Sequence, residues 1–206
     1  MHDPARRAFA AELYAAGREH DANHADRLAR WRNVEPETAE LLGVLARTKP
    51  RPRILEIGTS NGYSTIWLAD AAEATGGRVV TVDVEPERTA LARENLAKAG
   101  LDKHVELRTE DAAHALRTAE DDTFDLVFLD AERPAYVSYW PDLVRTLAPA
   151  GLLAVDNVIS HANEVESFRR VVDRDERVTA ALVPIGAGVL LVAAASRAAR
   201  APCRSG

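Results

Sequence analysis

Oxygen-bearing side chains stand at the end of one apolar run after another in this 206-residue chain. The residues that follow these runs are Asp83, Asp130, Asp156 and Asn157. Side chains of this type accept hydrogen bonds from the hydroxyl groups of a ligand, and they also bind hard cations. The chain therefore carries groups for two kinds of chemistry, provided that its fold brings them together.

The elements that must position these side chains alternate along the sequence. Short apolar runs separated by helix-length segments predict βαβ units and a parallel sheet. The expected strands are Ile54–Ile57, Val79–Val82, Val105–Leu107, Phe124–Leu129 and Leu152–Val155, and the expected helices are Thr65–Glu73, Glu87–Lys98, Ala112–Thr118, Tyr136–Leu147 and Glu164–Asp173. Val178–Pro184 and Val189–Ala194 follow as an antiparallel hairpin. We expect an α/β fold, with a Rossmann-like, seven-stranded, mostly parallel sheet and helices on both faces.

Three parts of the chain differ in pattern. Residues 1–50 are expected to form N-terminal helices, over Pro4–Ala29 and from Pro36 onward, that cap the acceptor side of the site. Residues 51–196 form the core, and the Ala/Arg-rich residues 197–206 are expected to be a disordered tail. The three tryptophans are expected to pack helices on the core, and the first of them, Trp31, precedes a segment that can fold over the substrate.

The first expected strand leads into a turn with Gly58 and Gly62, preceded by Glu56. This spacing lacks the third glycine of a dinucleotide fingerprint, and no Gly-Lys-Ser/Thr follows to make a P-loop. The E-x-G-x-x-x-G turn resembles motif I of class I S-adenosylmethionine-dependent methyltransferases. In that family the acid and the neighbouring backbone hold the methionine end of the cofactor.

Two further acids have a ligand-binding and a structural interpretation. Asp83 suits acceptance from two ribose hydroxyls, and it suits equally a strand-end carboxylate that caps the next helix. Because Asp83 follows a strand that comes after the glycine turn, we favour the interpretation that it binds the ribose. Asp111 lies at the position where members of the resembling methyltransferase family contact the adenine of the cofactor, so it could accept a hydrogen bond from the adenine amine. An N-cap for the following helix explains Asp111 nearly as well.

Asp130, Asp156 and Asn157 form the most specific group. Two carboxylates and a carboxamide from neighbouring strand ends are the hard oxygen ligands that Mg²⁺ prefers. Each residue alone is explained by strand termination, but an Asp-Asn pair beside a third acid favours a divalent-cation site.

The segments around these residues resemble the cation-dependent O-methyltransferases, which include catechol and caffeoyl-coenzyme A O-methyltransferases. The resemblance rests on Phe128–Tyr136, Val155–Val158 and Val34–Glu37 and covers roughly residues 34–194. It implies that Val34, Glu56, Gly58, Thr59, Ser64, Asp83, Asp111, Ala112 and Asp130 line S-adenosylmethionine, and that Asp130, Asp156 and Asn157 bind Mg²⁺ or another divalent cation. It also implies a homodimer, as is common among relatives.

The chain departs from the family pattern at two places. Relatives that methylate catechols usually have a lysine base three residues after the first metal aspartate, where this chain has Arg133, which cannot take up a proton at neutral pH. Arg133 either faces the substrate or forms a surface ion pair with Glu132. The terminal hairpin carries Gly186-Ala187-Gly188, where relatives often place an acid. His161 is either a base near the metal or, as we favour, an exposed loop histidine.

The composition of the chain argues against several kinds of binding partner. A net charge of −6 and 5% aromatic residues argue against nucleic-acid binding, and no apolar run has the length of a membrane span. The single cysteine, Cys203, cannot form an internal disulfide, and the N-terminus has no apolar signal core, so we expect a cytoplasmic protein.

These observations predict a magnesium-dependent O-methyltransferase that acts on a small catechol-like phenol, with Asp130 and Arg133 as the catalytic residues. The alternatives are a metal-independent methyltransferase for another small acceptor and a catalytically silent protein that binds S-adenosylmethionine.

Overall fold

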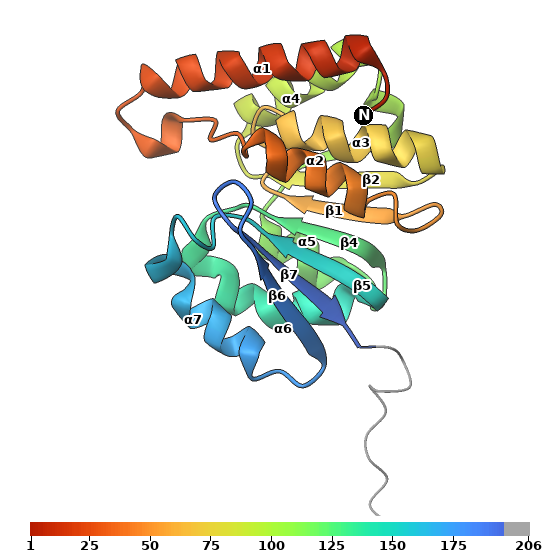
Figure 1. Cartoon of the computed structure of the whole chain (residues 1–206), viewed down its shortest axis with the longest axis vertical. Helices are drawn as coiled ribbons and strands as arrows, with labels where there is room; N and C mark the ends of the chain where they lie inside the picture. Colours follow the sequence, from red (N-terminus) through yellow and green to blue (C-terminus); the bar gives the residue numbers. More distant parts are fainter. Residues whose placement is uncertain (196–206) are drawn as a thin grey trace, which may run out of the picture.

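The computed structural model describes residues 1–195, so that the predicted tail and Cys203 lie outside the described residues. One sheet of seven strands runs through the molecule in the order β3-β2-β1-β4-β5-β7-β6 (Figure 1). The strands are β1 (Arg53–Ile57), β2 (Arg78–Asp83), β3 (Val105–Thr109), β4 (Phe124–Leu129), β5 (Leu147–Val155), β6 (Val178–Val183) and β7 (Val189–Ala194). β1 to β5 pair in parallel, and β7 pairs antiparallel with both β5 and β6. The predicted fold, with its terminal hairpin, is confirmed.

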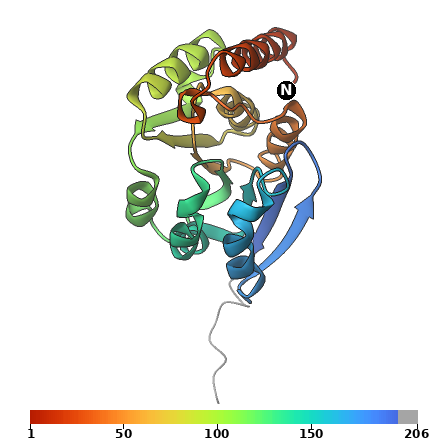
Figure 2. The ribbon, with the colours of Figure 1, turned by 90° about the vertical axis from the view of Figure 1, so that its left-hand side faces the viewer.

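Helices cover both faces of the sheet because successive strand residues point to opposite sides. The helices are α1 (Pro4–Ala22), α2 (Pro36–Leu45), α3 (Tyr63–Thr75), α4 (Pro86–Lys98), α5 (Ala112–Thr118), α6 (Tyr136–Thr146) and α7 (Ala162–Asp173). Ile54 of β1 packs in the cluster with α1 to α4, whereas its neighbour Leu55 packs in the cluster with α5 to α7. Seen from two directions, α1 lies at the opposite end of the molecule from α6 and α7 (Figures 1 and 2).

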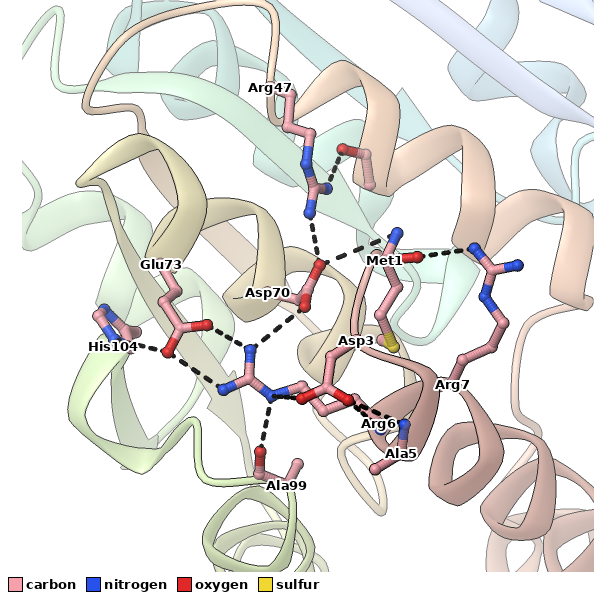
Figure 3. A network of polar contacts seen from close by, with 11 residues as sticks. Met1, Asp3, Ala5, Arg6, Arg7, Arg47, Asp70, Glu73, Ala99 and His104 are labelled. Atoms are coloured by element: carbon pink, nitrogen blue, oxygen red, sulfur yellow. Dashed lines mark hydrogen bonds and ion pairs between the residues drawn. The ribbon is translucent and has the colours of Figure 1, made fainter.

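An ion-pair network fixes α1 onto the core (Figure 3). Its centre is Asp70 of α3, which is 5% exposed. Asp70 accepts a hydrogen bond from Arg6 of α1 at 3.3 Å and pairs with Arg47, just after α2. Arg6 also pairs with Glu73 and donates through Nε to the carbonyl of Ala99 at 3.0 Å. The N-terminal helices are thus attached to the face formed by α3 and α4.

Two local features differ from the sequence-based expectation. β5 begins at Leu147 rather than Leu152, because a register shift lies between the pairs Phe124–Leu147 and Leu126–Leu152. The segment 23–35 between α1 and α2, here called the N-terminal strap, contains only a short 3-10 helix, η1 (Arg27–Ala29). Trp31 lies in this strap and stacks on His20 at a ring-centroid distance of 3.9 Å, so its predicted packing of a helix on the core is wrong.

Candidate active site

A cleft of about 470 Å³ lies at the carboxyl ends of the parallel strands, where ligands bind in open α/β sheets. Predicted site residues from six segments of the chain line it, and Glu56 is the exception. Those that line it are Val34, Gly58, Thr59, Ser64, Asp83, Asp111, Ala112, Asp130, Arg133, Asp156 and Asn157. The convergence expected from parallel topology is therefore present.

The turn after β1 requires glycine at Gly58. Its φ of 106° lies in the region that disfavours other residues, and a Cβ there would lie 2.4 Å from the carbonyl oxygen of Asp130. The N–H of Asp130 in turn donates to the carbonyl of Ile57 at 3.0 Å. This close approach joins the glycine turn to the end of β4, so the two predicted binding segments share one wall of the cleft.

Glu56 lies behind the cleft and does not line it. Its carboxylate is fully buried and accepts hydrogen bonds from the hydroxyls of Ser64 (2.6 Å), Thr81 (2.6 Å) and Thr65. Burial raises the pKa of Glu56 to about 6, against the effect of these hydroxyls. Because the Ser64 hydroxyl donates to Glu56, its lone pairs remain available to accept a hydrogen bond in the cleft. Glu56 orients Ser64 and has no open path to a ligand.

Asp83 and Asp111 both line the cleft, and both also bind backbone. Asp83 is 8% exposed and accepts from the N–H groups of Ser60 (2.8 Å) and Glu85 (3.0 Å), which holds the glycine turn against the end of β2. Asp111 accepts from the N–H of His114 at 3.0 Å and is the N-cap of α5. The N-cap interpretation of Asp111 is confirmed. Because Asp111 also lines the cleft, contact with the adenine of the cofactor stays a prediction.

Asp130, Asp156 and Asn157 meet at one corner of the cleft. The Nδ2 group of Asn157 donates to Asp130 Oδ1 at 2.9 Å and to Asp156 Oδ2 at 3.2 Å. Asp156 is 2% exposed, and its buried Oδ1 has no hydrogen-bond donor among the described residues. Burial and the neighbouring carboxylate raise the pKa of Asp130 well above its ordinary value, and burial raises that of Asp156.

A buried carboxylate, that of Asp156, and a half-buried one, that of Asp130, both contact the same amide, and this concentration of negative charge fits a divalent cation. Rotation of the Asn157 carboxamide would exchange its nitrogen for its oxygen and complete a set of three oxygens. Within residues 1–195 no cluster of three His, Cys, Asp or Glu side chains is suited to a metal, so a cation site here depends on that carboxamide.

Arg133 is 5% exposed and lines the cleft beside this corner. Its Nε donates to Glu164 Oε2 of α7 at 2.7 Å. The predicted pair with Glu132 is wrong, because Glu132 pairs with Arg27 (2.7 Å) and Arg32 (2.9 Å) of the N-terminal strap. Arg133 is the first residue of a short 3-10 helix, η3 (Arg133–Ala135), and lines the cleft, which fits the alternative that it faces the substrate.

Two further residues noted in the sequence, His161 and Ala187 of the terminal hairpin, also border the cleft. His161 precedes α7, is half-buried and lines the cleft, so its interpretation as an exposed loop histidine is wrong. Burial and the charge of Arg133 lower the pKa of His161 below its ordinary value. Ala187, between the hairpin glycines, also lines the cleft, and its carbonyl accepts from the N–H groups of Ile159 and Ser160 at 3.0 Å.

Sequence reasoning placed Val34 of the strap at the cofactor but missed the rest of the strap as a wall of the cleft. Trp31 and Arg32 line the cleft, held by Asp21, whose carboxylate accepts from both backbone N–H groups at 2.7 and 2.8 Å. Ser60 of the glycine turn donates to the carbonyl of Trp31 at 2.7 Å. The strap has no periodicity, so only its composition, with several arginines and a tryptophan, hinted at a role. Tyr139 of α6 was missed because its spacing is that of a core-facing helix residue.

The sheet order, the glycine turn and the strand-end acids together define a Rossmann-like methyltransferase of class I. The sequence model of the O-methyltransferase family matches residues 12–195, and the chain belongs to this family.

The chain is similar to proteins named catechol O-methyltransferase from Niastella koreensis (37% identity, covering 62% of this chain) and Mycobacterium tuberculosis (39%, covering 74%). The alignments span 58% and 65% of the length of these two relatives. Its structure is similar to that of the O-methyltransferase TomG from Streptomyces achromogenes in complex with SAM, with a TM-score of 0.77 and 30% identity over 95% of this chain and 92% of that one. The part of the chain that the structure describes has no helix with the length and apolar character of a membrane span.

Proposed function

We propose that this protein transfers a methyl group from S-adenosylmethionine to a hydroxyl of a small catechol-like phenol, at a site that also holds a divalent cation. The observation that carries this proposal is the convergence in one cleft of the glycine turn, Asp83 and the group Asp130, Asp156 and Asn157. Membership of the O-methyltransferase family, and relatives named catechol O-methyltransferase, support the same conclusion.

The cofactor side of the cleft runs from Val34 and Ser64 to Asp111. S-adenosylmethionine supplies an electrophilic methyl group on a sulfonium. Asp83 has lone pairs beyond the two that accept backbone N–H groups, and these suit the ribose hydroxyls. Ser64, with its proton directed to Glu56, presents an acceptor to the ammonium group of the methionine end. The strap borders this side and is joined to the glycine turn by the hydrogen bond from Ser60 to the carbonyl of Trp31.

On the acceptor side, Asp130, Asp156 and Asn157 would hold the cation. A bound divalent cation supplies positive charge that lowers the pKa of a phenolic hydroxyl. Arg133 cannot act as a base, but its guanidinium lies beside the two aspartates and stabilises negative charge on the acceptor oxygen. Its pair with Glu164 fixes the side chain in that position, so that little reorganisation is needed during transfer.

The test is a methyl-transfer assay with catechol and radiolabelled S-adenosylmethionine, run with Mg²⁺ and after treatment with EDTA. We expect transfer that is lost on chelation and restored by added Mg²⁺. Unchanged turnover after chelation would favour a metal-independent methyltransferase. Cofactor binding without transfer to any phenol would favour a catalytically silent protein.

A further inference from the structure

Three arginines and a histidine border the acceptor side of the cleft. Arg27 and Arg32 come from the strap, Arg133 from the turn after β4, and His161 from the residue before α7, and all four line the cleft. Three segments distant in sequence therefore meet at one wall, and two of them, the strap and the residues after β4, bring guanidinium groups to it.

The counter-charges on this wall are few and lie at its rim. Arg27 and Arg32 share one carboxylate, that of Glu132, whose side chain is 42% exposed. Glu164, the partner of Arg133, is 47% exposed. Asp130 and Asp156 add negative charge nearby, but in the proposed function a divalent cation offsets them. Apart from Asp130, Asp156 and Glu35, which lie on the side of the proposed cation, three guanidinium groups thus share two rim carboxylates, Glu132 and Glu164.

Several donors on this wall also lack acceptors. Within the described residues, the hydrogen bond of Arg133 uses Nε alone, which leaves its terminal nitrogens without a protein acceptor and open to the cleft. The Nε of Arg32 is buried and has no acceptor either. Buried charged donors without partners are costly, so an anionic ligand group in this part of the cleft would be stabilised strongly.

Hydrogen bonds to its backbone hold the strap in a fixed conformation. Arg32 adopts a φ of 53°, a conformation that is unfavourable for a residue with a side chain. The two hydrogen bonds from Trp31 and Arg32 to Asp21 hold it there. Arg88 of α4 also donates to the carbonyls of Leu28 and Arg30, so the strap is fixed on both sides of Trp31.

We propose that the methyl acceptor carries a carboxylate in addition to its two vicinal hydroxyls, and that Arg27 and Arg32 of the strap bind this carboxylate. The inference rests on the proposed function and narrows its acceptor to the dihydroxyaryl acids. A guanidinium pair matches a planar carboxylate in geometry as well as in charge. Glu132 occupies the guanidinium groups in the absence of the acceptor and gives up part of this contact when the acceptor binds.

The experiment compares 3,4-dihydroxybenzoate with 3,4-dihydroxybenzamide, which have similar shape and differ in one charge. We expect kcat/KM for the acid to exceed that for the amide by on the order of tenfold or more in the unaltered protein, because hydrogen bonds to charged groups are the stronger ones. Arg27→Gln is expected to bring this ratio toward one. Glu132→Gln removes the competing carboxylate and is expected to raise the ratio. Arg93→Gln, an exposed arginine of α4 away from the cleft, is the matched control and should leave the ratio unchanged.

A purely structural role for the pairs with Glu132 predicts that Arg27→Gln and Glu132→Gln change activity in the same direction, with no change in the ratio. That result, or an unaltered protein that prefers the amide, would overturn the proposal. If neither compound is methylated, the proposed function fails. Calorimetric binding of the acid and the amide to the protein with S-adenosylhomocysteine and Mg²⁺ would then test the arginines separately, and equal affinities would reject their role.

Discussion

Replacing Glu56 by glutamine should remove a pH-dependent part of the stability of this protein. The carboxyl group is fully buried beneath Ser64, and its pKa is raised from 4.5 to about 6. The folded protein therefore holds this proton more tightly than the unfolded chain does. The stabilisation is complete below the ordinary pKa and is lost as the pH rises through about 6. A difference of about 1.5 pKa units corresponds to ~2 kcal/mol.

The assay is urea unfolding of the unaltered protein and Glu56→Gln at about pH 4 and about pH 8. Between these pH values, the unaltered protein should lose ~2 kcal/mol more of its free energy of unfolding than the variant does. Any constant cost of rearranging the three hydroxyls cancels in this comparison. Glu12→Gln, an exposed position on α1, serves as the control and should follow the unaltered protein. Parallel pH profiles for the unaltered protein and Glu56→Gln would refute the reasoning.

The same variant tests how Glu56 reaches the cofactor. The Ser64 hydroxyl donates to Glu56 and so presents its lone pairs to the cleft. A glutamine amide can donate to that oxygen, which leaves the direction of the Ser64 proton undetermined. We expect affinity for S-adenosylhomocysteine, measured calorimetrically, to fall about two- to tenfold, the range of one ordinary hydrogen bond. Unchanged affinity would show that Ser64 makes no such contact.

The remaining two predictions concern stability. Gly58→Ala should destabilise the protein by well over ~1 kcal/mol, because its Cβ would lie 2.4 Å from the Asp130 carbonyl. Gly100→Ala shares a left-handed φ but meets nothing nearer than 4.0 Å, so equal losses of melting temperature would contradict the clash. Asp175→Asn should lower the free energy of unfolding at pH 7 by ~1–2 kcal/mol, since Arg177 holds the pKa of Asp175 at about 2. This difference should vanish as the pH falls through about 2, whereas Asp173→Asn, at an exposed position, should have little effect in the same urea titration.

Local pattern was sufficient for the elements of the sheet. Strand runs and helix-length segments alternate so regularly that the order of elements followed from periodicity, and parallel topology then required Asp83, Asp130 and Asp156 to converge. The bulge that moves the start of β5 to Leu147 was not visible, because it depends on pairing with Phe124. Register between strands is a property of two segments, and neither carries it alone.

The residues proposed to hold the cofactor and the cation were largely accessible from the sequence, since all of them except Val34 end or follow a strand, or follow the glycine turn. Glu56 shows the limit of this reasoning. Its position in the motif suggested contact with a ligand, but burial and three hydroxyl partners turn it into support for Ser64. Whether a side chain faces a cleft or lies behind it depends on packing from other elements.

The grouping of charged side chains on one wall of the cleft was determined by tertiary structure. Arg27, Arg32, Arg133 and His161 have no shared spacing, and their meeting depends on how the strap and the loops after β4 and β5 are folded against one another. Asp21 accepts hydrogen bonds from the N–H groups of the strap, and Arg88, which is far from the strap in the chain, donates to its carbonyls, and these contacts determine that fold. The amino-acid sequence by itself determined the sheet and the chemistry at its strand ends, because both follow from local periodicity. The charge around the acceptor was determined by long-range contacts, which no local pattern encodes.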